Sequence, residues 1–202
     1  MKCAIVGNSP IVLEKEWGNE IDSHDIVVRF NIAKMEGFEK HVGSKSSIRF
    51  SNLHPVLCRT SKVHLEEHAS HFPEWDNDAI LNWKNEDIYF KGVAGTLESS
   101  ELFEILLKNN NRIHHIDPVA VERIKRMIGF EPTMGILSVI AMTSQQFDEV
   151  NCYGFNFYED VENSHYFEKV MKYDQHEQCH NHEVEKKLIM SFHEAGKIRI
   201  NR

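Results

Sequence analysis

Near its start the chain reads Cys3-Ala4-Ile5-Val6-Gly7-Asn8-Ser9-Pro10, an apolar run that leads directly into a polar turn. Such a run is typical of a central strand that is covered on both faces. Gly7 permits a turn that a side chain would obstruct, and Asn8 or Ser9 can cap whatever follows. A strand that ends in such a turn presents backbone N–H groups that suit a phosphate. The turn contains neither G-x-G-x-x-G nor a P-loop lysine, so it is not a common dinucleotide or P-loop fingerprint.

Outward from this strand, apolar and amphipathic segments alternate along the chain. Strands are predicted at residues 26–30, 47–50, 79–83, 87–90, 112–116, 150–155 and 197–200. Helices are predicted at residues 98–108, 119–128, 133–144 and about 180–196, with a helix and loop at 61–79. Strands separated by helices imply a mainly parallel central sheet flanked by helices. No linker divides the chain, so we expect a single α/β domain over residues 1–202, with ligands outside the carboxyl ends of its strands.

The composition is that of an ordinary globular protein. Of the 202 residues, 41% are hydrophobic and 27% are charged, and the net charge of −8 argues against a nucleic-acid partner. No segment approaches the length of a membrane span, and no signal peptide precedes the first strand. Cysteines stand at four positions whose spacing matches no disulfide scaffold: Cys3, Cys58, Cys152 and Cys179. These features predict a soluble cytoplasmic protein of bacterial type with reduced thiols.

Two further stretches extend the pattern of the first strand. Residues 20–31 read EIDSHDIVVRFN, and residues 37–45 read GFEKHVGSK. Together with residues 3–10 they resemble the large sialyl motif, motif L, of the sialyltransferases of glycosyltransferase family 29. The resemblance implies a Rossmann-like fold of the GT-A type, with a donor nucleotide at this edge of the sheet. The donor-binding residues that it implies here are Gly7, Asn8, Ser9 and Asn31, with Arg29 in a supporting role.

Residues 131–137 (EPTMGIL) and 148–155 (DEVNCYGF) form a second match. Pro132 at a helix entry, followed by exposed N–H groups, makes a cradle for an anion. The two segments resemble motif S of the same family, in which two adjacent hydroxyl residues open the helix. Here Thr133 keeps one hydroxyl, whereas Met134 lacks the other. The donor contacts that the resemblance implies come from Thr133, Gly135, Tyr153 and Gly154.

Animal members of this family join a cysteine of motif L to a cysteine of motif S. Cys3 matches the first position, but Phe147 occupies the second. Cys152 lies five residues further on, an odd spacing that is expected to turn its side chain to the alternate face of the strand. The disulfide of the animal enzymes is therefore not expected here.

Two histidine motifs follow. Residues 165–168 (HYFE) resemble motif III, and residues 180–185 (HNHEVE) resemble motif VS, a His followed by four residues and a Glu. The resemblance implies that His165 contacts the donor phosphate, that His180 is the general base and that Glu185 supports the last helix. An imidazolium beside a phosphate stabilises departing charge, and a His that titrates near neutrality can take the proton of the acceptor hydroxyl.

A metal site is the rival interpretation of the last motif. Four potential ligands fall within seven residues: His176, Cys179, His180 and His182. A structural zinc site of this type needs a second ligand pair, and the sequence offers no paired cysteines. Asp76-Asn77-Asp78 imitates the Asp-x-Asp metal motif of other sugar transferases, but its polar surroundings favour a turn. We therefore predict no metal and no cofactor, and His182 stays the second candidate for the base.

The four matches fall in the family's order along the chain. They predict an inverting, metal-independent glycosyltransferase that moves sialic acid from CMP-sialic acid to a hydroxyl of a glycan acceptor. Two alternatives stay open: a transferase of another CMP-activated sugar such as Kdo, and a non-catalytic relative that binds CMP or a glycan. The predicted partners are the CMP-sugar donor and a glycan, with no nucleic acid, no transmembrane segment and no Golgi anchor of the animal type.

Overall fold

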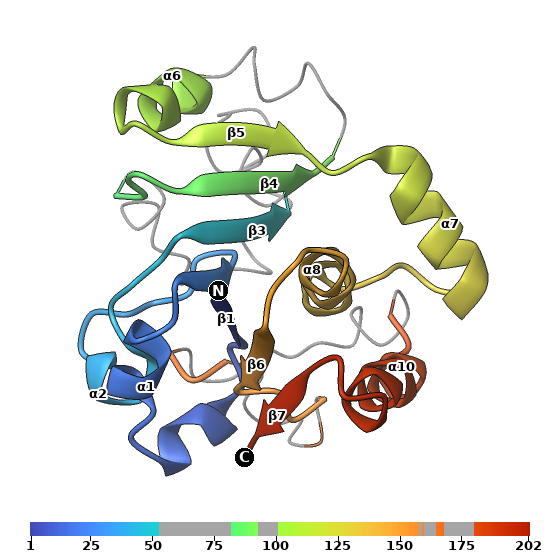
Figure 1. Ribbon diagram of the computed structural model, residues 1–202. Helices are drawn as coiled ribbons and strands as arrows, with labels where there is room; N and C mark the ends of the chain where they lie inside the picture. Colours follow the sequence, from blue (N-terminus) through green and yellow to red (C-terminus); the bar gives the residue numbers. More distant parts are fainter. Residues whose placement is uncertain (53–81, 93–100, 158, 160–164, 168–179) are drawn as a thin grey trace.

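The computed structural model describes residues 1–52, 82–92, 101–157, 159, 165–167 and 180–202, and it shows an α/β fold (Figure 1). Within these residues, seven strands form one sheet in the order β5-β4-β3-β2-β1-β6-β7, and every pairing is parallel. The strands are β1 (Lys2–Val6), β2 (Ile26–Phe30), β3 (Ile48–Asn52), β4 (Asp87–Lys91), β5 (Arg112–His115), β6 (Glu149–Tyr153) and β7 (Arg199–Asn201). The predicted Rossmann-like class with a parallel central sheet is confirmed.

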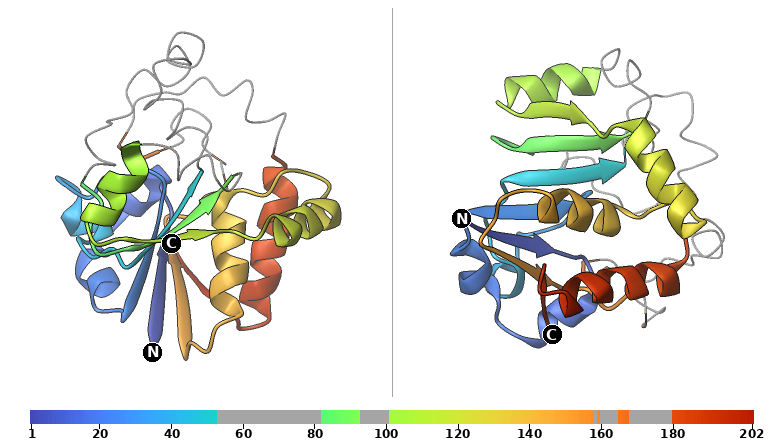
Figure 2. Two further views of the ribbon diagram at one scale, coloured as in Figure 1. Left: turned by 90° about the horizontal axis from the view of Figure 1, so that it is seen from above. Right: turned by 45° about the vertical axis from the view of Figure 1, so that its right-hand side comes forward.

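Helices cover both faces of the sheet (Figure 2). One face carries α7 (Pro118–Ile128), α8 (Met134–Thr143) and α10 (His182–Glu194). The other face carries the 3-10 helix η1 (Pro10–Glu14) together with α1 (Gly18–Asp22), α2 (Glu39–Val42) and α6 (Glu101–Lys108). Among the described residues, no helix combines the length and apolar character that crossing a bilayer requires.

The apolar run of β1 is explained by burial on both faces. Ile136 of α8 packs in one core cluster with Ile5 and Phe50, and α8 contacts β1, β2 and β3 on one side and α10 on another. Behind the same strands, Val27 and Val42 belong to a second cluster that α1, α2 and η1 cover. A strand that is packed on both sides reads as a continuous apolar run rather than an alternating one. The predicted central strand is therefore confirmed.

Most predicted elements are present within a few residues of their expected bounds. The strand predicted at 79–83 is wrong for Asn82 and Trp83, which lie outside any strand, and residues 79–81 lie outside the described residues. The helix and loop predicted at 61–79 also lie outside them. The short helices η1, α1 and α2 were not predicted, because four or five residues are too few for a periodic pattern.

Cys3 and Cys152 are buried free thiols on the same face of the sheet, so the expected alternate facing of Cys152 is wrong. The register pairs Cys3 with Val150 and Ile5 with Cys152, so the two thiols lie on neighbouring strands but are not directly opposite. Burial raises the pKa of the Cys3 thiol to about 12, and it also raises the pKa of the Cys152 thiol. Cys58 and Cys179 lie outside the described residues.

Candidate active site

The predicted donor-binding turns meet at one edge of the sheet. β2, β1 and β6 are neighbours and run parallel, so the turns at their carboxyl ends lie side by side (Figure 1). Asn8 follows β1 and Asn31 follows β2, and the Asn8 side chain donates through Nδ2 to the carbonyl oxygen of Phe30 at 3.4 Å. The structure therefore brings Asn8 and Asn31 together, at the edge where ligands of open parallel sheets bind.

Gly7 and Gly154 allow the turns after β1 and β6 to touch. Gly7 N donates to Tyr153 O at 2.7 Å, and Ser9 N donates to Gly154 O at 3.4 Å. A Cβ atom on Gly7 would lie 2.3 Å from Gly154 O, and one on Gly154, whose φ is +68°, would lie 2.7 Å from Gly7 O. Both glycines are thus required by backbone packing. Their predicted contact with the donor stays a prediction.

The side chain of Tyr153 is a core group. It is fully buried beneath α1, and its hydroxyl donates to Glu20 Oε1 at 2.8 Å. Burial and this hydrogen bond raise the pKa of the phenol. The predicted contact of Tyr153 with the donor therefore does not follow for its side chain. Ser9 also has a structural contact, because its hydroxyl accepts from Ile11 N at 3.4 Å and caps η1.

The Asn8 turn is fastened to the motif III segment. Tyr166 N donates to Asn8 O at 2.8 Å, and the Tyr166 hydroxyl donates to Lys34 O. The neighbouring His165 ring stacks on Phe167, with centroids 5.2 Å apart and planes 10° from parallel. Within the described residues, Asn8 Oδ1 is buried and has no hydrogen-bond partner. The predicted phosphate partner His165 thus belongs to a segment that touches the turn where the nucleotide is expected.

Asn31 is held in an unusual backbone conformation. Its φ is +45°, in the left-handed region that residues other than glycine seldom adopt. Its backbone N–H donates to Phe50 O at 2.9 Å, and its Oδ1 accepts from Asn52 N at 3.0 Å. Since Oδ1 is engaged, the Nδ2 group is the part of the side chain that can donate to a ligand.

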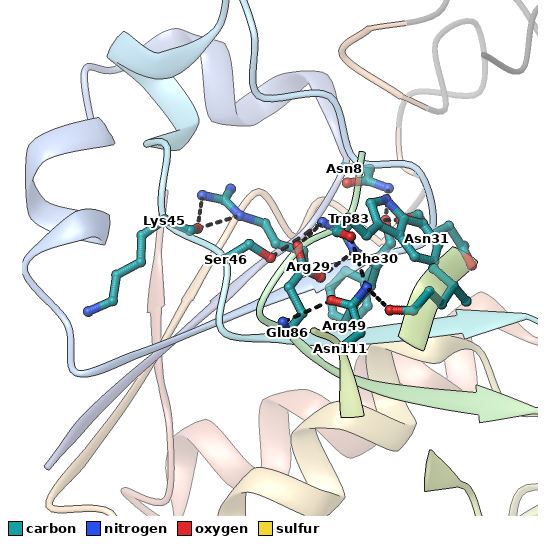
Figure 3. Close-up of polar contacts among 11 residues, drawn as sticks. Asn8, Arg29, Phe30, Asn31, Lys45, Ser46, Arg49, Trp83, Glu86 and Asn111 are labelled. Atoms are coloured by element: carbon teal, nitrogen blue, oxygen red, sulfur yellow. Dashed lines mark hydrogen bonds and ion pairs between the residues drawn. The ribbon is translucent and has the colours of Figure 1, made fainter. Parts of the chain in front are cut away.

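Arg29 has a different place from the one expected. Its side chain is fully buried, and Nε and Nη2 donate to Lys45 O at 3.1 and 2.8 Å. Lys45 precedes β3, so the guanidinium points away from the edge that carries Asn8 and Asn31 (Figure 3). Burial lowers its pKa to about 10. The expectation that Arg29 reaches the donor edge is corrected, because its guanidinium is bound to the Lys45 carbonyl at the opposite end of β3.

The start of α8 is capped from two sides. Thr133 Oγ1 accepts from Ile136 N at 3.3 Å, while Thr133 N and Oγ1 donate to the two Glu185 oxygens, each at 2.7 Å. Glu185 therefore stabilises α8, rather than only its own helix α10. Burial raises the pKa of the Glu185 carboxyl, although the bonds from Thr133 oppose this shift. The amide of Ile136 is thus capped by Thr133, whereas those of Met134 and Gly135 have no acceptor within the helix and can face an anion.

His180, the predicted general base, lies beside the same turn. Its Nδ1 contacts Glu131 O at 2.5 Å, and because a carbonyl can only accept, Nδ1 carries the proton. Burial lowers the pKa of His180 below its ordinary value near 6.5, while the bond to Glu131 opposes this shift. The ring is therefore neutral at pH 7, with its lone pair on Nε2. His182 lies close by, with ring centroids 6.0 Å apart, and burial lowers its pKa as well.

Lys91 completes this end of the site and was not predicted. It lies at the end of β4, and Nζ donates to Glu131 Oε1 at 3.1 Å and to Pro132 O at 3.0 Å. The Glu131–Pro132 turn that it holds supplies the carbonyl that orients His180 and leads into Thr133. The predicted strand places Lys91 at the correct edge, but its partners are forty residues away in sequence and leave no local signal.

The metal alternatives stay untested. His176, Cys179, Asp76 and Asp78 lie outside the described residues. Among the residues that the structure does describe, no group of three or more His, Cys, Asp or Glu side chains is placed to share one ion.

A parallel sheet that helices cover on both faces, with polar turns at one carboxyl edge, defines a Rossmann-like fold of the GT-A type. The family model described as glycosyltransferase family 29 (sialyltransferase) matches residues 1–197. The chain belongs to that family.

Individual relatives agree with this assignment. A pig CMP-N-acetylneuraminate-beta-galactosamide-alpha-2,3-sialyltransferase 1 is 33% identical over 171 residues, which cover 83% of this chain and 47% of the relative. An Arabidopsis thaliana beta-1,6-galactosyltransferase is 54% identical over 52 residues, 26% of this chain and 13% of the relative. A crystal structure of a mammalian sialyltransferase with Gal-beta-1-3GalNAc-ortho-nitrophenol superposes with a TM-score of 0.62 at 25% identity, over 99% of this chain and 68% of that one. The chain spans about half the length of the pig relative.

Proposed function

We propose that this chain transfers sialic acid from CMP-sialic acid to a hydroxyl of a glycan acceptor. Family membership and the activity for which the pig relative is named support the donor class. The observation that carries the chemistry is the geometry of His180. Its Nδ1–H is held by Glu131 O, and its lowered pKa keeps Nε2 unprotonated at pH 7. A half-buried imidazole with a fixed tautomer and a lowered pKa is suited to act as a general base.

The carboxyl edge supplies the other half of the reaction. In this proposal the cytidine monophosphate lies against Asn8 and Asn31, and the first turn of α8 and His165 face its phosphate. Backbone amides and an imidazole can stabilise the departing phosphate, which carries less charge than a diphosphate, without a metal ion. The acceptor hydroxyl, deprotonated by His180, attacks from the opposite side of the sugar, so the anomeric configuration inverts. Inversion, metal independence and a cytoplasmic location remain predictions.

Galactose is a second candidate for the transferred sugar. The Arabidopsis relative is called a galactosyltransferase, and its 54% identity covers a quarter of this chain. A similar segment therefore occurs in a family member that is named for another sugar. Contacts to CMP would likewise be shared between sialic acid and Kdo donors.

A donor panel tests the proposal. The purified chain is incubated with CMP-sialic acid, CMP-Kdo or UDP-galactose, with and without a panel of galactose-terminated acceptors, and nucleotide release is measured. We expect CMP release from CMP-sialic acid, slow without acceptor and faster with one. Nucleotide release only from CMP-Kdo, or only from UDP-galactose, would identify that sugar nucleotide as the donor instead. CMP binding without release from any CMP-sugar would indicate a non-catalytic relative.

A further inference from the structure

A buried polar cluster of Arg49, Glu86, Trp83 and Asn111 lies behind Asn31 (Figure 3). Arg49 donates from Nε to Glu86 Oε2 at 2.7 Å and from Nη2 to Glu86 Oε1 at 2.9 Å. The two side chains are only 1% and 4% exposed, and the guanidinium lies over the Trp83 ring, 4.5 Å from its centroid. A bidentate pair stacked on an aromatic ring fixes the guanidinium in one orientation.

The remaining nitrogen of this guanidinium is directed at the candidate donor site. Arg49 Nη1 donates to the backbone carbonyl of Asn31 at 2.7 Å. Asn31 is the residue whose φ is +45°, a conformation that costs asparagine less free energy than most residues but more than glycine. A charged donor on its carbonyl offsets that cost, and the Asn52 N–H bond to Oδ1 then fixes the direction of the side-chain amide.

We propose that Arg49 is a positioning residue, which holds Asn31 in the left-handed conformation and so aims its Nδ2 group at the donor nucleotide. This inference rests on the proposed function for the nucleotide contact, but not for the effect on Asn31 itself. Stability alone does not account for the cluster, because a buried ion pair is often no more stable than apolar residues of similar size.

The two residues that orient Arg49 are themselves held in place by hydrogen bonds. Asn111 Oδ1 accepts from Glu86 N at 3.0 Å, and Asn111 Nδ2 donates to Trp83 O at 2.8 Å. Glu86 and Trp83, the two groups that orient Arg49, are thus tied to each other through one buried amide. This support lets Arg49 impose a geometry on Asn31 instead of adapting to it.

The test uses a double variant, Arg49→Met with Glu86→Gln. It removes the hydrogen bond to Asn31 while leaving no unpaired buried charge, and the net charge of the chain is unchanged. The matched control is Arg112→Met with Asp87→Asn, which removes a second arginine–carboxylate pair of the same sheet, where Arg112 is exposed and has no contact with Asn31. Asn31→Gly supplies a background in which the left-handed conformation carries no strain and the side chain is absent.

Two readouts are measured: CMP affinity by calorimetry, and hydrogen exchange of the Asn52 amide by NMR. We expect the Arg49/Glu86 variant to weaken CMP binding about tenfold in the wild-type background and not at all in Asn31→Gly. The Asn52 amide should exchange faster in this variant, while the Arg112/Asp87 control changes neither readout. Equal weakening in both backgrounds, or unchanged protection of the Asn52 amide, would overturn the inference.

Failure of the inference and failure of the proposed function give different results. If the wild-type chain does not bind CMP while the Asn52 amide still loses protection, the proposed function fails and the positioning of Asn31 stands. If Asn31→Gly weakens CMP binding but the Arg49/Glu86 variant does not, the inference fails and the nucleotide site stands. Should the double variant not fold, Arg49→Lys replaces it. A lysine keeps the buried charge but cannot reach both Glu86 oxygens and the Asn31 carbonyl.

Discussion

His180 combines two properties that a general base needs, a fixed tautomer and a neutral ring. Removing a general base typically lowers the rate by a factor of about 10²–10⁴. We therefore expect His180→Ala to reduce kcat by that order with CMP affinity little changed, since the proposed base acts on the acceptor and not on the nucleotide. His165→Ala should weaken both turnover and CMP binding, since the proposal places His165 against the departing phosphate. Steady-state kinetics and CMP calorimetry on both variants measure the difference.

The pH–rate profile of the same variants gives an independent check. The pKa of His180 lies below 6.5, so kcat of the wild type should decrease only when the pH is lowered below that value. The residual activity of His180→Ala should not show this decrease. His182→Ala is the control, because its ring lies beside His180 and also has a lowered pKa. If His182→Ala loses turnover and His180→Ala retains it, the general base is His182 and not His180.

Glu185 makes the stability depend on pH in a defined direction. Burial raises its pKa, so the folded chain binds this proton more tightly than the unfolded chain does. The resulting stabilisation is complete below about pH 4.5 and is lost as the pH rises through the raised value. We expect the difference in unfolding free energy between wild type and Glu185→Gln to fall over that range and then level off, as measured by urea unfolding. A difference independent of pH would contradict the raised pKa.

At the scale of residues, sequence patterns predicted which turns lie at the candidate site, but not the direction of every side chain there. Asn8 and Asn31 could be predicted because each directly follows an apolar strand, and parallel strands end at one edge. Tyr153 and Arg29 could not be resolved by motif alone, because the partners that bury them come from α1 and from the loop before β3. The bond between Glu185 and Thr133 spans 52 residues and has no local signature.

The capped start of α8 is the element on which the site is built. Thr133→Val removes the N-cap and leaves one Glu185 oxygen without its hydroxyl donor. We expect a loss of about 2–4 kcal/mol of unfolding free energy, against about 1 kcal/mol for Asn181→Ala, which removes only the cap of α10. Urea unfolding of both variants measures this. Equal losses would show that the Glu185 contact adds no stability.

At the same scale, long elements were predictable and short ones were not. α8 could be predicted because its apolar run is ten residues long and follows a proline and a capping threonine. α1 and α2 contain five and four residues, and their position depends on tertiary contacts with β1 and β2. Propensity carries little information at that length.

At the scale of the whole molecule, the described turns after β1, β2 and β6 lie at one carboxyl edge of the parallel sheet, and the proposed chemistry there uses amides and imidazoles. We therefore expect transfer activity to survive prolonged dialysis against EDTA, as judged by CMP release. Loss of activity that zinc or magnesium restores would instead support a metal site at the cluster of His176, Cys179, His180 and His182 or at Asp76 and Asp78.

The binding of CMP to this edge is the most direct test of the proposed site. Calorimetry should give a Kd in the micromolar to millimolar range for the wild-type chain. Asn8→Ala and Asn31→Ala should each weaken binding about tenfold, since each removes an amide that the proposal places against the nucleotide. Arg112→Met, on the exposed end of β5, should bind CMP as the wild type does. Wild-type affinity in both asparagine variants would contradict the placement of the donor at the carboxyl ends of β1 and β2.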